Sequence, residues 1–279
     1  MAKERKIENQ SSIKAWEQDE GQASLRARTL QNNCPILLDF LSSDMKVLDV
    51  GCGPGTITLD VARKVTGGSV VGVDASETAI GHARSTVVES GLKNVDFRTG
   101  DAYSLDFSDD TFDLVYSNQV LEYLRRPADA LREQARVTRR GGWVISMQRS
   151  WGFYVLYPPC PAYDRLVKAL HRDGEDSYYN NLSSSEAVAN LIQAGFGDYR
   201  IICFTPDVGL IHPKSEYFDH AYREFKGLLG HIGSNDDLRA QTAVDQDTID
   251  AADAEVENWH RHPHALHLIP CIAACGHVE

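Results

Sequence analysis

The sequence has no excess of basic residues, no paired cysteines and no long apolar run. Its formal net charge of -12 argues against DNA or RNA as a partner, because nucleic-acid affinity comes chiefly from Lys and Arg side chains that neutralise phosphates. The six cysteines include no Cys-x-x-Cys pair and no Cys/His set at zinc spacing, so the sequence predicts neither a disulfide framework nor a metal site. A chain of this kind is typical of a reducing compartment.

Targeting signals are absent from the sequence as well. Residues 1–6 are charged where a signal peptide would become apolar, and no window contains eighteen uninterrupted apolar residues. We therefore expect a cytoplasmic protein with no membrane span.

Acidic residues are unevenly distributed. Between Ser234 and Asn258 the chain has eight Asp or Glu residues and a single cation, Arg239. We interpret this run as the solvated face of a helix.

Apolar, β-branched runs alternate with helix-like segments in the first half of the chain. The runs lie at residues 46–50, 69–73, 113–117 and 143–147, with a weaker one at 95–98. Helices are predicted between them at 57–64, 75–90, 120–123 and 128–137. Pro127 begins the last helix, and Gly141-Gly142 is interpreted as its stop. Strand-helix alternation predicts a parallel sheet.

The second half of the chain departs from this alternation. Residues 151–179 are interpreted as an aromatic and proline-rich crossover with a short helix near 163–171. A capped helix at 183–194 then precedes a sixth strand at 199–204. Residues 207–263 are mostly polar, with helix-like stretches at 215–229 and 248–260, and residues 266–275 are predicted to form a seventh strand that closes the sheet.

The most informative segment is Gly-Cys-Gly-Pro-Gly-Thr at residues 51–56, directly after the first predicted strand. Closely spaced glycines let the backbone turn tightly and let a ligand approach without Cβ collisions. The Gly-x-Gly-x-Gly spacing departs from the Gly-x-Gly-x-x-Gly fingerprint that places a pyrophosphate at a helix N-terminus. A ligand with adenosine and an amino acid, but no phosphate, suits the loop better.

Polar residues follow the next three predicted strands. Asp74 ends the second, where a carboxylate can accept both ribose hydroxyls, although NAD-binding folds share that position. Asp101 can accept from an adenine amino group while the Ala102 N–H donates to the ring. Alone, Asp101 would be a surface turn residue, but its place behind the glycine loop and Asp74 favours binding. Asn118 and Gln119 end the fourth strand at the carboxyl edge, where open α/β sheets bind ligands.

These four features resemble the class I methyltransferases that depend on S-adenosyl-L-methionine (SAM), in particular the branch of ubiquinone and menaquinone biosynthesis. The resemblance covers roughly residues 10–205. It implies a doubly wound, Rossmann-like α/β fold with six parallel strands and a reversed seventh, and SAM as cofactor. By that resemblance the sites are Gly51, Cys52, Gly53 and Thr56 at the methionine part, Asp74 and Ala75 at the ribose, Asp101 and Ala102 at the adenine, and Asn118 and Gln119 beside the sulfonium.

The segment before the first strand carries a further likeness. Residues 28–33, Arg-Thr-Leu-Gln-Asn-Asn, resemble an Arg-Thr…Asn element of fungal members. Arg28 is then a candidate for the SAM carboxylate and Trp16 for a lid residue over the cofactor. An ordinary charge on an amphipathic helix is the alternative for Arg28.

The resemblance also organises the chain into parts. We expect a helical cofactor lid at 1–44, a SAM-binding α/β domain at 45–206, a helical substrate cap at 207–263 and a closing strand at 264–279. The insertion at 207–263 is longer than the short hairpin of the simplest members, and such insertions usually cover the acceptor pocket.

A narrower resemblance is to fungal secondary-metabolite methyltransferases, including the gliotoxin bis-thiomethyltransferases that cap dithiols. It implies a small-molecule acceptor, first of all a thiol or dithiol such as a reduced epidithiodioxopiperazine. A thiol with a pKa of about 8.5 is partly ionised at neutral pH and needs no dedicated base. Methylation of a phenol or quinol at oxygen or carbon is the alternative.

Catalytic residues stay open, with Asn118, Gln119 and His264 as candidates. Four histidines lie between residues 260 and 267, and in an extended stretch three of them share one face. Because no Cys or carboxylate completes a metal set there, surface histidines are the favoured interpretation. A non-catalytic SAM-binding protein and an NAD-dependent oxidoreductase are alternatives of another class; the second lacks the third-glycine spacing and a Tyr-x-x-x-Lys signature. The sequence leaves the oligomeric state open.

Overall fold

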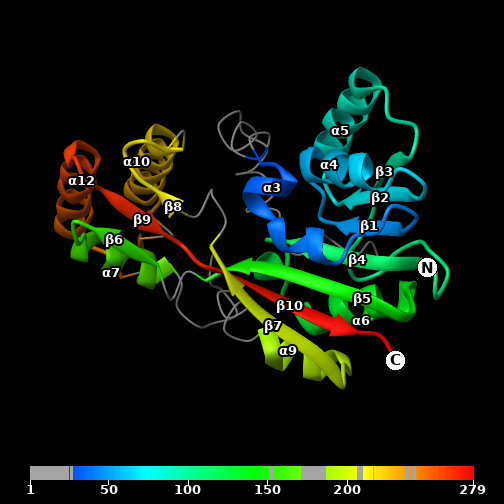
Figure 1. The fold of residues 1–279 in the computed structure, drawn as a ribbon. Helices are drawn as coiled ribbons and strands as arrows, with labels where there is room; N and C mark the ends of the chain where they lie inside the picture. The colour runs from blue at the N-terminus through cyan, green and yellow to red at the C-terminus, as the bar shows by residue number, and fades with distance from the viewer. Residues whose placement is uncertain are drawn as a thin grey trace. The chain divides into compact units, whose positions relative to one another are not determined.

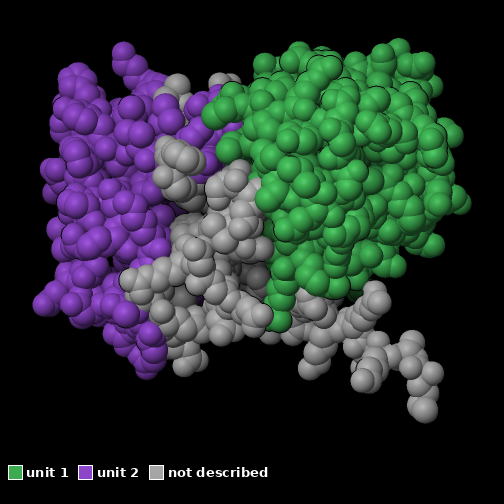
Figure 2. All heavy atoms as spheres, turned by 90° about the horizontal axis from the view of Figure 1, so that it is seen from below, with its two compact units in different colours: residues 1–149, 182–204, 272–279 green, residues 150–181, 205–271 purple. Residues whose placement is uncertain are grey.

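A computed structural model describes residues 25, 28–150, 154–170, 187–205, 210–215, 217–236, 239–240 and 243–279. Trp16 and the predicted helix start at 183–186 therefore lie outside the described residues. The chain divides into two compact units, drawn in green and purple in Figure 2. Unit 1 comprises residues 1–149, 182–204 and 272–279, and unit 2 comprises residues 150–181 and 205–271.

Unit 1 is built on a seven-stranded sheet with the order β3-β2-β1-β4-β5-β10-β7 (Figure 1). The first five strands in this order, from β3 to β5, are all parallel to one another. The strands are β1 (Lys46–Val50), β2 (Ser69–Asp74), β3 (Val95–Thr99), β4 (Phe112–Asn118), β5 (Thr138–Arg149), β7 (Asp198–Phe204) and β10 (Cys271–His277).

Strand β10 runs against its two neighbours. Near the start of β5, the Gly141 N–H donates to the carbonyl of Val278, which follows the end of β10. On the other side, His277 at the end of β10 lies 3.6 Å from the carboxylate of Asp198 at the start of β7. The sheet therefore has the reversed strand that the family resemblance implies.

Two layers of helices cover the sheet (Figure 1). One core cluster joins α3 (Leu30–Asn33), η1 (Pro35–Asp39) and α4 (Thr56–Lys64) to one face, and another joins α6 (Pro127–Val137) and α9 (Ala187–Ala194) to the other. Because both faces are covered, β1 is buried from Val47 to Val50, as expected of a central parallel strand.

The remaining helices of unit 1 begin and end at the residues that their chemistry favours. Helix α5 (Glu77–Ser90) begins after Ser76, whose side chain accepts a hydrogen bond from the Ala79 N–H, and ends at Gly91 in the left-handed conformation. The 3-10 turn η2 (Leu121–Tyr123) follows β4.

Unit 2 combines a small sheet with three helices. Strands β6 (Val155–Tyr157), β9 (Leu266–Leu268) and β8 (Leu210–Ile211) form an antiparallel sheet. Helices α7 (Pro161–Leu170), α10 (Phe218–Ser234) and α12 (Gln246–Arg261) bury the aromatic side chains of Tyr163, Phe225 and Trp259 among them. Of the other aromatic residues that the structure describes in this unit, Phe218 is buried, Tyr154, Tyr217 and Tyr222 pack against this core, and Tyr157 is exposed. No helix in the described ranges is both long and apolar enough to cross a membrane.

The acidic run of α12 is more than a solvated face. The Glu255 carboxylate accepts hydrogen bonds from the backbone N–H groups of Ala162 and Tyr163 in the first turn of α7. Asp253 and Glu257 both pair with Lys226 of α10. Part of the acidic run thus holds the three helices of unit 2 together.

The structure corrects three expectations about the second half of the chain. The single closing strand predicted at 266–275 is two strands in two different sheets, interrupted at Ile269-Pro270, because proline has no N–H to continue a ladder. The segment interpreted as a crossover contains α7, which confirms the short helix predicted near 163–171, but it also contains β6 and belongs to the same compact unit as residues 205–271.

The third correction concerns Gly141-Gly142, which lie inside β5 and do not stop α6. The strand begins at Thr138, directly after the helix, and its register against β4 jumps between Phe112 and Leu114. A Cβ on Gly142 would lie 2.7 Å from the Asp113 carbonyl oxygen, so glycine is needed for this close approach.

Candidate active site

The glycine loop makes the tight turn that its spacing predicts. Gly51, Gly53 and Gly55 have φ values of 79°, 53° and 80°, in the left-handed region that favours glycine. The N–H of Gly51 donates to the Val73 carbonyl of β2 over 2.7 Å. A Cβ on Gly51 would collide with Val120 at 2.3 Å, whereas a Cβ on Gly53 would meet no atom of the described residues within 4 Å. As far as these residues go, the loop has open space beside Gly53.

Asp74 connects the end of β2 to this loop. Its Oδ2 accepts from the Gly53 N–H at 2.8 Å, and its Oδ1 accepts from the Ser76 N–H at 2.9 Å. Burial raises the pKa of Asp74, and backbone hydrogen bonds from Ser76, Gly53 and Ala75 oppose that rise. The carboxylate thus lies next to the open face of Gly53, with further lone pairs for a ligand's hydroxyl groups.

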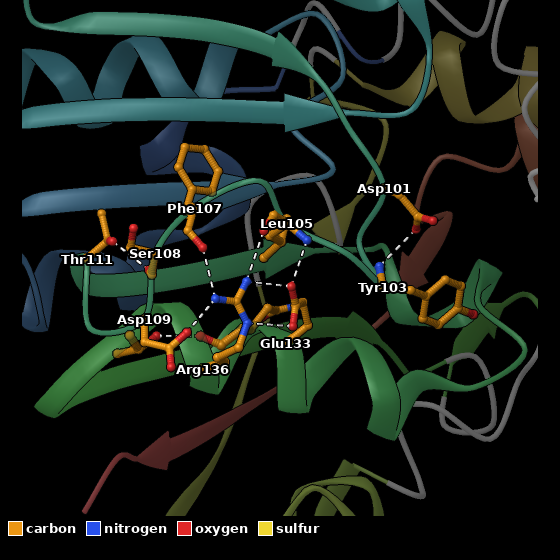
Figure 3. A network of polar contacts seen from close by, with 11 residues as sticks. Asp101, Tyr103, Leu105, Phe107, Ser108, Asp109, Thr111, Glu133 and Arg136 are labelled. Carbon is orange, nitrogen blue, oxygen red and sulfur yellow. Dashed lines mark hydrogen bonds and ion pairs between the residues drawn. The ribbon is translucent and has the colours of Figure 1, made fainter. Parts of the chain in front are cut away.

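The loop after β3 is held from below by a charged network (Figure 3). Arg136 of α6 binds Glu133 and donates to the carbonyl oxygens of Leu105 and Phe107 at 2.9 Å each. Earlier in this loop, Asp101 accepts from the Tyr103 N–H at 2.9 Å through Oδ1. Asp101 is exposed, and within the described ranges its Oδ2 takes part in no hydrogen bond.

Asn118 and Gln119 leave β4 at the same edge. The Asn118 Nδ2 donates to Asn33 Oδ1 over 2.6 Å, which ties β4 to α3. Gln119 has a positive φ of 55°, and its N–H donates to the Met147 carbonyl at 2.7 Å. The Nε2 of Gln119 and the Nδ2 of Asn33 are buried without a hydrogen-bond partner among the residues that the structure describes.

The segment before β1 is anchored to α4. Thr29 and Asn32 form a capping box at the start of α3, and the Leu30 N–H donates to Asp60 Oδ2 at 3.0 Å. Thr56, the first residue of α4, donates its hydroxyl to the Leu25 carbonyl at 3.3 Å. Arg28 lies in this segment and is 9% exposed.

Glu122 is a buried acid that sequence reasoning missed. It is 3% exposed and lies in η2, which begins two residues after Gln119. Burial raises its pKa to about 7, while the charges of Arg149 and Arg28 lower it. The sequence does carry a signal for Glu122, because an acidic residue there interrupts the apolar run Val-Leu-Glu-Tyr.

Asp49 is a second buried acid without a role in the sequence analysis. Its Oδ2 accepts from the Thr58 hydroxyl at 2.6 Å and from the Tyr116 hydroxyl at 2.7 Å. Burial raises its pKa to about 7, and the two hydroxyls oppose the rise. Burial also raises the pKa of the neighbouring Cys52 thiol, so this cysteine stays protonated at neutral pH. The sequence signal for Asp49 is a carboxylate inside the otherwise apolar run Val-Leu-Asp-Val.

The histidine candidates belong to unit 2. His260 lies in α12, stacked on Tyr222 with ring centroids 3.9 Å apart, so it belongs to the helix predicted at 248–260 and not to an extended stretch with His262 and His264. His264 is exposed and stays an untested catalytic candidate. The described part of the chain holds no group of three metal-ligating side chains.

The candidate residues of unit 1 thus gather at the carboxyl ends of β1, β2, β3 and β4. A family model described as a methyltransferase domain matches residues 41–193, which contain all four strand ends. The chain belongs to the class I SAM-dependent methyltransferases.

Two relatives agree with this assignment. An uncharacterized methyltransferase of Schizosaccharomyces pombe is 35% identical over 151 residues, which cover 52% of this chain and 54% of that protein. A ubiquinone biosynthesis O-methyltransferase of Bordetella bronchiseptica is 33% identical over 156 residues, with 55% and 62% covered. The methyltransferase thus spans little more than half the length of these two relatives.

The fold is also that of a phosphoethanolamine N-methyltransferase of Haemonchus contortus solved with SAM. The TM-score is 0.52 at 18% identity, over 87% of this chain and 51% of that one. At this identity the likeness shows the fold alone.

The residues of the methyltransferase fit its cofactor SAM. Open space beside Gly53 and the carboxylate of Asp74 suit a ribose, and they lie over β1 and β2. Among the described residues, Asn33 Nδ2 and Gln119 Nε2 have no hydrogen-bond partner; these donors lie by β4 and suit a ligand with acceptor oxygens. These groups suit a ligand that has hydroxyl groups at one end and acceptor oxygens at the other, as SAM has.

Proposed function

We propose that the enzyme methylates a small, uncharged thiol or dithiol metabolite. The observation that carries this proposal is the absence of histidine and lysine from the loops that follow β1 to β4. Residues 51–55, 75–76, 100–111 and 119–126, which follow β1 to β4, contain neither His nor Lys. An acceptor that ionises by itself suits such a site best.

The cofactor assignments of the sequence analysis become part of this proposal. Asp74 and Ala75 bind the ribose, and Asp101 and Ala102 bind the adenine. Gly51, Cys52, Gly53 and Thr56 line the methionine part, with Asn118 and Gln119 beside the sulfonium. Arg28 binds the carboxylate, and Trp16 belongs to the lid. When bound, SAM supplies a methyl group on a cationic sulfur.

Alignment of the acceptor is then the main contribution of the protein. Well-oriented reacting groups lower a barrier by about 7–11 kcal/mol without any acid or base. The acceptor thiolate attacks the methyl carbon, the new sulfur–carbon bond forms as the old one breaks, and the thiol proton goes to solvent. Cys52 cannot take over the nucleophile's role, because burial and the charges of Asp49 and Asp74 raise its pKa.

A phenol or quinol acceptor is the second candidate, because Glu122 has the right acidity for a base. Its pKa of about 7 lies near the operating pH, where a general base is most effective. The O-methyltransferase relative from Bordetella bronchiseptica supports the same acceptor class.

One set of assays separates the two candidates. A reduced dithiol, a phenol and a quinol are incubated with enzyme and SAM, and mass spectrometry detects products heavier by one methyl group. We expect turnover of the dithiol, and Glu122→Gln should leave it intact. Glu89→Gln, at an exposed position of α5, serves as the matched control. Turnover confined to the phenol or quinol, and lost in Glu122→Gln, would contradict the thiol proposal.

The acidic insertion at 207–263 is proposed to cover the acceptor. Its charge would disfavour carboxylated or phosphorylated acceptors, although exposed charges more than about 10 Å away are largely screened at physiological salt. A neutral dithiol should therefore have a lower KM than its carboxylated analogue, and the difference should shrink at high salt. Equal KM values at low salt would exclude this electrostatic role.

A further inference from the structure

Asn33 is the last residue of α3 and lies against the edge where the candidate site forms. Its side chain is 1% exposed, although its neighbour Gln31 on the same short helix is exposed. The capping box of Thr29 and Asn32 and the bond from Leu30 to Asp60 fix this helix against α4. Asn33 therefore has a defined position, set by contacts that do not involve its own amide.

The two ends of the Asn33 amide have different surroundings. Its Oδ1 accepts from Asn118 Nδ2 at 2.6 Å and from the Cys34 thiol at 3.6 Å. Because both of these partners are donors, the oxygen is the end that faces them, and the Nδ2 points elsewhere. That Nδ2 has no hydrogen-bond partner within the described part of the chain. A buried donor without a partner is costly, so a ligand atom is expected to accept from it.

The sheet order decides which part of the cofactor this atom belongs to. Asp74 and Asp101 follow β2 and β3, on one side of β1, and Asn33 is bonded to Asn118 at the end of β4, on the other side. A ligand whose ribose and adenine lie over β2 and β3 extends its amino-acid part towards β4. Of the groups in that part, the ammonium only donates and the sulfonium has no acceptor oxygen. The carboxylate is the group that can accept.

We propose that Asn33 is a cofactor-binding residue whose Nδ2 donates to the SAM carboxylate, while its Oδ1 holds Asn118 in place. The inference rests on the orientation of SAM in the proposed function. It is independent of the acceptor.

The test compares two ligands that differ only in the carboxylate. S-adenosylhomocysteine and its decarboxylated analogue are titrated calorimetrically into the native enzyme, Asn33→Leu and the control Gln31→Ala. We expect Asn33→Leu to weaken S-adenosylhomocysteine about ten-fold more than the decarboxylated analogue, because only the first ligand loses the hydrogen bond from Nδ2, whereas the release of Asn118 affects both ligands alike. Gln31→Ala should change neither affinity.

Asn33→Asp provides a second variant if Asn33→Leu does not fold. It keeps an oxygen for Asn118 and replaces the donor with a group that repels a carboxylate, so the same selective loss is expected above neutral pH. Equal weakening of both ligands, or no weakening of either, would overturn the assignment. Because no acceptor is present, a wrong thiol proposal would leave these results unaffected.

Discussion

Replacing Asp49 with asparagine should change how the stability of the enzyme depends on pH. Asp49 is 3% exposed, and its Oδ2 accepts from both Thr58 and Tyr116. Burial is the main reason that its pKa rises from 3.8 to about 7. Because both hydroxyls donate to one oxygen, the amide oxygen of asparagine can keep both hydrogen bonds. The substitution therefore removes the charge and preserves the contacts.

The sign follows from the direction of the shift. The folded-state pKa lies above the unfolded-state value, so between about pH 4 and pH 7 the folded protein binds the extra proton. The free energy of unfolding contributed by Asp49 then falls as pH rises, by about 1.4 kcal/mol per pH unit, for a total of up to ~4 kcal/mol above pH 7. The Asp49→Asn variant has no carboxyl group at this position, so it does not lose stability in this way as pH rises. Relative to the native enzyme, its stability should rise between pH 5 and pH 7 and level off above.

Urea unfolding at pH 5, 6, 7 and 8 measures the difference. Asp39→Asn, at an exposed position, is the matched control and should show a constant difference from the native enzyme. Glu122 titrates in the same range, but it is present in all three proteins and cancels. A stability difference between Asp49→Asn and the native enzyme that stays constant from pH 5 to pH 8, with equal urea dependence, would refute the reasoning.

Three further predictions concern the cofactor site. Asp74→Ala should weaken SAM binding about ten-fold or more in calorimetry, because the ribose loses its acceptor; unchanged affinity in a folded variant would exclude the ribose role. Gly51→Ala should destabilise the protein more than Gly53→Ala in urea unfolding: both strain a positive φ by about 1–2 kcal/mol, but only the first brings a Cβ to 2.3 Å from Val120. Amide exchange in Thr29–Asn33 should slow when S-adenosylhomocysteine is added, because the ligand adds contacts to this segment; equal rates would count against a lid.

The sequence by itself determined the parallel sheet and most of its edge. Apolar runs that are buried on both faces alternate with amphipathic helices, and this pattern leaves few other architectures. The glycine loop and Asp74 come directly after such runs, so their place at the carboxyl edge follows from local order alone. The structure has both there, joined by the hydrogen bond from the Gly53 N–H to Asp74.

Only the tertiary structure decided how the second half of the chain is used. Strand β6 is three residues long and pairs with β9, more than a hundred residues further along the chain. No local sequence pattern could therefore predict it. The same holds for Ile269-Pro270, where one apolar stretch divides between two sheets. The stretch at 151–179 was therefore interpreted as a connection, although its residues between Leu156 and Val167 contribute to the core of unit 2.

The acidity of the buried polar groups also could not be predicted from the sequence. The pKa of Asp49 depends on Thr58 and Tyr116, and that of Glu122 depends on Arg28 and Arg149, which come from distant segments. Composition places these residues in the chain, but their acidity is set by burial and by partners. Those exist only after the strands and helices have packed, because desolvation is a property of the folded core.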